Sequence, residues 1–121
     1  MLSPHDWGDS GKREAALMVA FSQFLVFFGF AVEAIPFDGQ DSVDKHFRKA
    51  EQMIDEAQSF PQLLRALVIL FHALFGNRPA TRGQMVKMMR GCLENGANLE
   101  AKRQIAHMLV RSLQTEISRT A

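Results

Sequence analysis

Residues 11–34, GKREAALMVAFSQFLVFFGFAVEA, form the longest apolar stretch of the chain and decide its fold. Between residues 15 and 32 only Ser22 and Gln23 carry polar side chains, so the pattern predicts a helix that is buried on most sides. Pro36 sets its end, because the residue before a proline is pushed out of the helical region. A narrow stripe of small residues at heptad spacing permits the close approach of another backbone, inside a bundle or across a dimer: Ala15, Ser22 and Gly29.

The same stretch allows two other interpretations. Residues 15–32 lie at the lower edge of membrane-spanning length, and residues 32–34 resemble a signal-peptidase site. Three acidic residues among the first fourteen, against two basic ones, make a poor leader for export. We therefore favour a buried helix in a cytoplasmic protein, with a membrane anchor and a signal peptide as alternatives.

Four further helices are predicted, over residues 42–58, 60–75, 81–94 and 98–118. Capping boxes at residues 59–62 and 81–84 open two of them, and Asn98 caps the last. Gly76 suits a left-handed end to the helix over 60–75, and Pro79 is read as a stop after it. Two of these helices carry a clear apolar stripe. The stripe of the helix over 42–58 consists of Val43, Phe47, Ala50, Ile54 and Ala57, and that of the helix over 98–118 consists of Ile105, Leu109, Leu113 and Ile117.

The predicted fold class is all-α. No segment shows the period-two alternation of a strand, and the connections between helical patterns are only a few residues long. A chain of 121 residues is the size of one ordinary domain. We therefore expect a single compact bundle of about five helices, with residues 1–10 as an irregular N-terminal tail and residues 11–121 as one helical domain.

No cluster of residues is typical of catalysis, a cofactor site or a metal site. The single cysteine, Cys92, is read as a small buried apolar residue, and His72 as a core histidine. Residues 38–44 begin like a calcium loop, but Val43 and Lys49 occupy its glycine and glutamate positions. We expect a protein that is not an enzyme and that uses no cofactor and no metal.

The two halves of the chain carry opposite charge. Residues 1–60 hold ten acidic and five basic side chains, whereas residues 61–121 hold three acidic and nine basic ones. The basic half suggests an acidic protein partner or, as an alternative, a nucleic-acid-binding regulator built on a helix-turn-helix of the last two helices. The candidate residues for either partner are Lys87, Arg90, Lys102, Arg103 and Arg111.

The chain has more apolar side chains than one small bundle can bury. Such exposed apolar surface is most often covered by a second copy of the same chain. The expected function is a small helical protein-interaction module, an adaptor or regulator acting as a homodimer. The residues expected at the centre of the bundle or at the dimer seam are Phe21, Phe24, Leu25 and Phe28. A soft methionine stripe offers a second partner surface, with ordinary core as the competing interpretation: Met85, Met88 and Met89.

Overall fold

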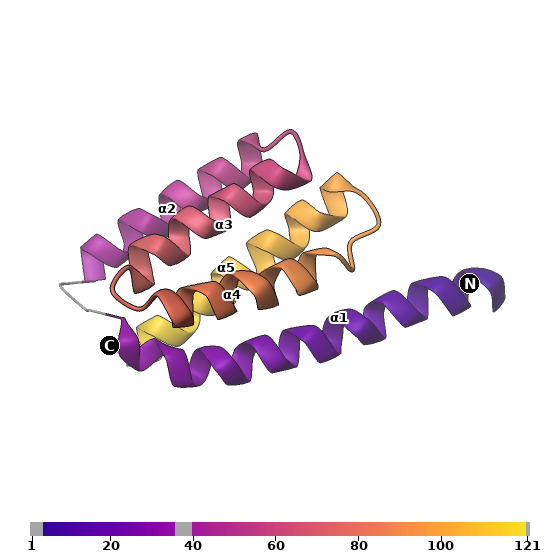
Figure 1. Cartoon of the computed structure of the whole chain (residues 1–121). Helices are drawn as coiled ribbons and strands as arrows, with labels where there is room; N and C mark the ends of the chain where they lie inside the picture. Colours follow the sequence, from indigo (N-terminus) through magenta and orange to yellow (C-terminus); the bar gives the residue numbers. More distant parts are fainter. Residues whose placement is uncertain (1–3, 36–39, 121) are drawn as a thin grey trace.

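The computed structural model describes residues 4–35 and 40–120, which form five α-helices and one short 3-10 turn (Figure 1). The described residues contain no strand, so the all-α prediction is confirmed. The elements in chain order are α1 (Pro4–Ala31), η1 (Val32–Ala34), α2 (Gln40–Glu56), α3 (Phe60–Phe75), α4 (Pro79–Leu93) and α5 (Leu99–Thr120).

Helices α2 to α5 make a four-helix body, and α1 lies along one side of it. Helix α2 packs against α3 and α5, and α4 packs against α3 and α5, so the four enclose one core. Helix α1 packs mainly against α4. Its N-terminal end projects beyond the turn that joins α4 to α5 (Figure 1).

The core follows the helical periodicity of the sequence. All five apolar positions predicted for the stripe that begins at Val43 are buried, and so are the four predicted along α5, from Ile105 to Ile117. These two helices each have one apolar face and one charged face, and such a pattern leaves a single way to bury the apolar side.

The predicted helix caps are found at two of three places. The Ser59 hydroxyl accepts a hydrogen bond from the backbone N–H of Gln62 at 3.4 Å, while the Gln62 side chain accepts one from the backbone N–H of Gln58 at 2.6 Å. Asn98 Oδ1 accepts from the backbone N–H of Ala101 at 2.9 Å. These bonds satisfy backbone donors that the first turn of a helix leaves free.

Two predicted helix starts are wrong because each helix begins earlier in the chain than expected, at a proline. Helix α1 begins at Pro4, so the N-terminal segment is helical from residue 4 and not an irregular tail. Helix α4 begins at Pro79, and Gly76 keeps a right-handed φ of −52°. The fixed φ of proline suits the first helical turn, where its missing N–H costs nothing.

Candidate functional site

Helix α1 buries one face in its own chain. Phe24 and Phe28 are both fully enclosed, with their rings nearly parallel at 12° and 6.4 Å between centroids. Phe21 and Leu25 are partly buried and pack against the same core. Of the two expected positions, Phe24 and Phe28 take the central one and are not at a dimer seam, because the body formed by α2 to α5 already covers them.

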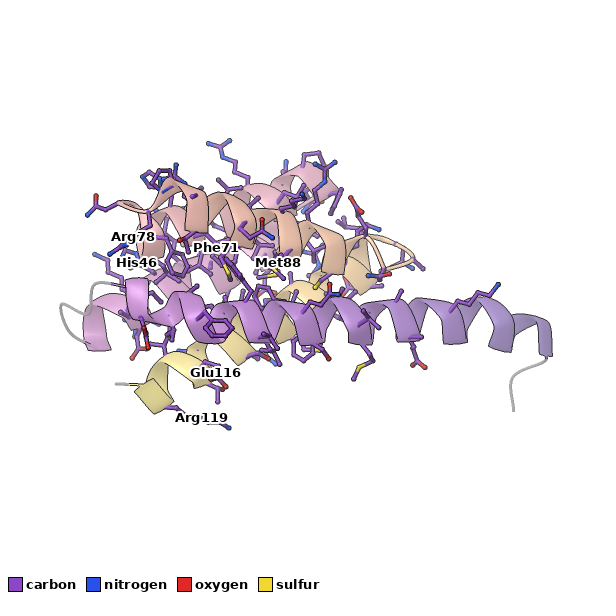
Figure 2. All side chains as sticks on the ribbon, turned by 60° about the horizontal axis from the view of Figure 1, so that its bottom comes forward. His46, Phe71, Arg78, Met88, Glu116 and Arg119 are labelled. Atoms are coloured by element: carbon purple, nitrogen blue, oxygen red, sulfur yellow. The ribbon has the colours of Figure 1, made fainter. Side chains whose placement is uncertain are left out.

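The opposite face of α1 is apolar and uncovered. Figure 2 shows α1 in front of the body with no other helix on its near side. Six large apolar side chains are exposed among the described residues, and four of them lie on this helix: Met18 (61% exposed), Val19 (58%), Val26 (63%) and Phe30 (78%). The other two, Val68 and Met108, lie on α3 and α5 and are less exposed, at 40% and 38%.

The exposed side of α1 also carries a hollow. It is open to solvent, has a volume of about 410 Å³, and is lined by Ser22, Gln23, Val26, Phe27 and Phe30. Two polar side chains, Ser22 and Gln23, and three larger apolar ones thus line the same hollow, which gives this surface relief. A relief of this kind can receive side chains from another helix.

The prediction that residues 15–32 are buried on most sides is wrong for a single chain. The window 14–31 has a mean hydropathy of 1.7, and only 17% of its residues are buried. By length and composition alone this helix is able to cross a membrane, and it is the one such helix among the described residues. The four-helix body has room for one face of α1, since α2 to α5 already enclose one another.

The methionine stripe is core. Met85 and Met89 are fully buried, and Met88 is partly buried against the core. The prediction of a partner surface is therefore wrong for Met85 and Met89, for which the competing interpretation of ordinary core is confirmed. The reason is the position of α4 between α1, α3 and α5, which covers Met85 and Met89 completely and Met88 in part.

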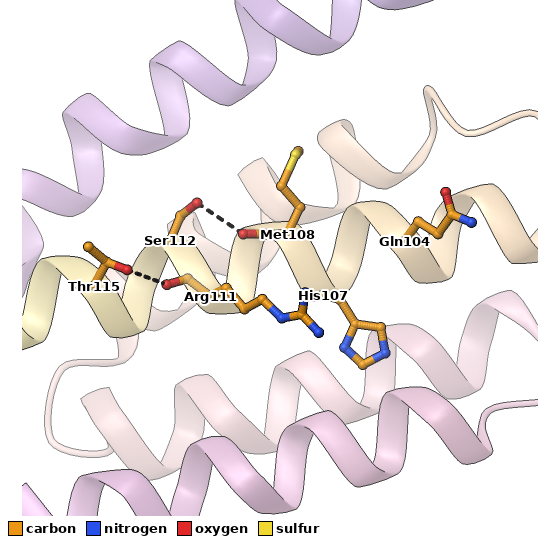
Figure 3. A pocket seen from close by; sticks show the side chains of 6 residues that line it. All are labelled: Gln104, His107, Met108, Arg111, Ser112 and Thr115. Carbon is orange, nitrogen blue, oxygen red and sulfur yellow. Dashed lines mark hydrogen bonds between the residues drawn. The ribbon is translucent and has the colours of Figure 1, made fainter.

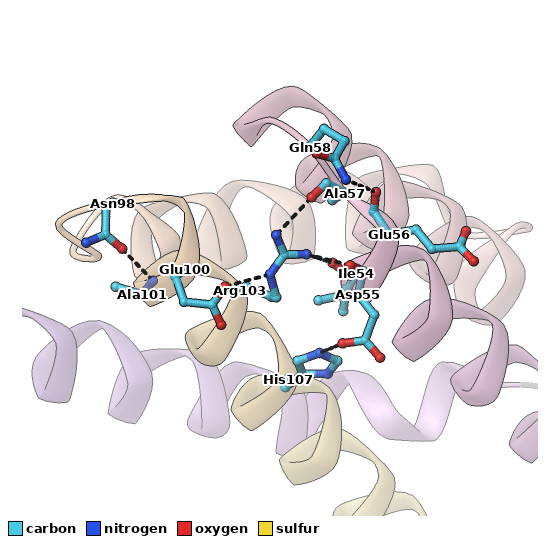
Figure 4. Close-up of polar contacts among 10 residues, drawn as sticks. All are labelled: Ile54, Asp55, Glu56, Ala57, Gln58, Asn98, Glu100, Ala101, Arg103 and His107. Atoms are coloured by element: carbon cyan, nitrogen blue, oxygen red, sulfur yellow. Dashed lines mark hydrogen bonds and ion pairs between the residues drawn. The ribbon is translucent and has the colours of Figure 1, made fainter.

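Arg103 is used inside the fold. Its guanidinium donates to the backbone carbonyls of Ile54 at 2.5 Å, Asp55 at 2.9 Å and Ala57 at 2.9 Å, and its Nε pairs with Glu100 at 3.1 Å (Figure 4). A cation at this position satisfies the free carbonyls at the C-terminal end of α2. Arg103 is therefore a helix cap, and the prediction that it binds an outside partner is wrong.

Lys102 is likewise committed to its own chain. Its ammonium donates to the backbone carbonyl of Gly96 at 2.5 Å and lies 5.4 Å from the ring centre of Phe60. These contacts tie the turn between α4 and α5 to the start of α3. The structure thus removes two of the five basic residues that sequence analysis assigned to an acidic or nucleic-acid partner.

The other three basic candidates are exposed but scattered over two helices. Lys87 and Arg90 lie on α4, where Arg90 pairs with Glu94 at 3.2 Å, and Arg111 lies on α5. Arg111 lines an open groove of about 510 Å³ along α5 (Figure 3). In this groove the hydroxyls of Ser112 and Thr115 donate to carbonyls of their own helix, at 2.9 and 3.0 Å, so their protons are not available to a ligand.

His72 lies on the surface, so its assignment to the core is wrong. Its Nδ1 accepts a hydrogen bond from the Arg82 guanidinium at 3.0 Å, since an arginine can only donate. His72 also lines a hollow of about 180 Å³ between α2 and α3, together with His46 and Lys49. Sequence analysis missed this grouping because the three residues lie on two helices whose pairing is a tertiary contact.

Cys92 is fully buried as predicted, and burial raises the pKa of its thiol to about 11. A thiol with that pKa is not a nucleophile near neutral pH. Within residues 4–35 and 40–120 no group of three or more His, Cys, Asp or Glu side chains is placed to hold a metal ion. The side chains of Asp38, Gln40 and Ser42 in the calcium-like segment lie outside the described residues.

Among the described residues, the uncovered face of α1 thus carries most of the exposed large apolar side chains. Comparisons with protein-family models, with curated proteins and with solved structures find no match to this chain.

Proposed function

We propose that this chain is a non-enzymatic protein-interaction module that associates with a second copy of itself through the uncovered face of α1. The observation that carries the proposal is the concentration of exposed apolar side chains there: four of the six large ones in the described chain, with Phe30 78% exposed. Soluble domains rarely leave a contiguous apolar surface uncovered unless something binds to it.

The energetic reason lies in the side chains themselves. Fully burying a valine, methionine or phenylalanine side chain is favourable by about 1.5–3 kcal/mol. Val26 and Phe30 leave most of their surface in water in the single chain. A partner that covers this face recovers that free energy, and part of it offsets the entropy lost on association.

Two alternative functions have less support. Nucleic-acid binding would have to proceed without Lys102 and Arg103, whose cationic groups contact backbone carbonyls of their own chain. Insertion across a membrane would require α1 to withdraw the buried rings of Phe24 and Phe28 from the core. Self-association uses α1 as it lies in the fold.

The test is the molar mass of the full-length chain in detergent-free solution, measured by light scattering over a wide range of concentration. The expected result is a dimer, twice the 13.6 kDa chain mass. The variant Val26→Lys combined with Phe30→Ser should give a folded monomer, because both side chains are exposed and neither contributes to the core. Circular dichroism checks that its helix content is unchanged.

The matched control is Val68→Lys, which adds the same charge at an exposed apolar position on α3 and should leave the dimer intact. A wild-type chain that stays monomeric at every concentration contradicts the proposal. A dimer that the α1 variant does not weaken places the interface elsewhere and contradicts it as well. Recovery of the chain only in detergent would replace self-association with membrane attachment.

A further inference from the structure

We propose that the second copy packs antiparallel on α1, with the two-fold axis of the dimer beside Ser22. This inference rests on the proposed self-association and specifies its geometry. It makes the two helices a short antiparallel pair enclosed between two four-helix bodies, with one oppositely charged pair of residues at each end.

The first observation is a regular row of exposed residues along α1 and η1. Seven positions alternate at spacings of three and four residues, which is the spacing of the contact row of a helical coiled coil. All seven residues are exposed, so no other part of the same chain covers them. This outer row consists of Lys12, Ala15, Val19, Ser22, Val26, Gly29 and Glu33.

The charges at the ends of the outer row select the direction of the partner. The row begins with Lys12 and ends with Glu33, and both side chains are exposed. An antiparallel partner places Lys12 beside the partner's Glu33 at both ends of the seam. A parallel partner would instead set lysine against lysine and glutamate against glutamate, which is unfavourable.

The sizes of the side chains agree with the same register. With the axis beside Ser22, Ala15 lies opposite the partner's Gly29, and Val19 lies opposite the partner's Val26. Small residues therefore meet small ones, which lets the backbones approach closely, and valines meet valines in the layers between. A Cβ built on Gly29 would have no atom within 4 Å, so that position is open to receive a neighbour.

The arrangement also suits the rest of the fold. The four-helix body lies on the side of α1 that buries Phe24 and Phe28, so two copies joined through their outer rows keep their bodies apart. The 28 residues of α1 span about 42 Å, and the N-terminal end projects from the body (Figure 1).

Cysteine cross-linking tests the register. Ser22→Cys should form an intermolecular disulfide under mild oxidation, because the two copies of that residue face each other across the axis. Cys92 does not interfere, since it is fully buried. Gln104→Cys, at an exposed position on α5, is the control and should stay monomeric on a non-reducing gel.

A mixed experiment separates antiparallel from parallel packing. Ala15→Cys on a tagged chain and Gly29→Cys on an untagged chain should cross-link to each other. Neither should cross-link to itself, because like positions stand about 21 Å apart along the helix. Self-cross-linking of Ala15→Cys would overturn the antiparallel direction.

Charge reversal gives a second readout that needs no oxidation. Lys12→Glu alone and Glu33→Lys alone should each weaken the dimer, by about two- to fivefold in the dissociation constant. The two changes together should restore it. Weakening that is not rescued in the double variant overturns the pairing of Lys12 with the partner's Glu33.

Failure of this inference is distinguishable from failure of the proposed function. A dimer that Val26→Lys with Phe30→Ser disrupts, but that Ser22→Cys does not cross-link, keeps self-association through α1 and overturns the register. A wild-type monomer overturns both. Gly29→Leu adds a further check: it should leave the monomer folded, because the site is open, yet it should weaken the dimer by inserting bulk where the backbones meet.

Discussion

His107 on α5 and Asp55 on α2 face each other, with the ring Nε2 2.7 Å from the carboxylate Oδ1 (Figure 4). The other ring nitrogen, Nδ1, contacts Glu51 one turn earlier on α2. The imidazole of His107, which lies in the basic half of the sequence, thus contacts two carboxylates from the acidic half. The acidic and the basic half of the sequence thus meet, at this contact, within a single chain.

Replacing His107 should destabilise the fold through this bridge. In His107→Gln the two carboxylates lose the ring that lies between them, so we expect the free energy of unfolding to fall by about 1–3 kcal/mol. Urea denaturation of the single and double variants with Glu51→Gln should give a coupling energy of about 1 kcal/mol or more. Glu94→Gln is the control, since its pair with Arg90 is exposed and should be worth less than about 1 kcal/mol. Additive losses in the double variant would show that His107 and Glu51 do not interact.

Arg103 should be more sensitive to a conservative change than a surface cation is. Arg103→Lys keeps the charge but loses the planar fork that reaches the carbonyls at the end of α2, so we expect a loss of about 2 kcal/mol in chemical denaturation. Arg119→Lys, at an exposed site that pairs with Glu116 one turn earlier, should change stability by less than about 0.5 kcal/mol. Equal effects at the two sites would rule out the capping role.

Two glycines should respond in opposite directions to alanine. A Cβ on Gly96 would lie 2.8 Å from the backbone nitrogen of Lys102, so Gly96→Ala should destabilise the turn between α4 and α5 by about 1–3 kcal/mol. A Cβ on Gly83, inside α4, would meet nothing within 4 Å, so Gly83→Ala should stabilise the protein by about 0.5–1 kcal/mol. Thermal unfolding checks both, and a stabilising Gly96→Ala would contradict the close approach.

Cys92 should be inert in the native chain and should make stability fall at alkaline pH. Burial raises the pKa of its thiol from 9.0 to about 11, so the folded state holds the proton more tightly than the unfolded state does. The stabilisation is complete below pH 9 and is lost as the pH rises from about 9 to 11. The difference in unfolding free energy between wild type and Cys92→Ala should therefore shrink over that range.

Thiol labelling provides the second readout for Cys92. A maleimide at neutral pH should modify the thiol only after denaturation, because the side chain is fully buried in the fold. Rapid labelling of the native protein would contradict this burial.

The sequence by itself determined where most of the helices lie, and it determined which face of a helix is buried wherever only one face is apolar. The stripes of α2 and α5 have a polar opposite side, so local periodicity decided that Phe47 and Leu109 are core. The caps at Ser59 and Asn98 act within one turn of their own helices and were readable for the same reason.

Tertiary structure decided everything that depends on which helix lies beside which. Helix α1 is apolar nearly all round, so no periodicity distinguishes the side that buries Phe28 from the side that exposes Phe30; the packing against α4 makes that choice. Arg103 looked like a surface cation because its partner carbonyls lie 46 to 49 residues away in the chain. A local pattern records the surroundings of a residue only within its own helix, and the inner and outer faces of α1 and the role of Arg103 are set by contacts between helices.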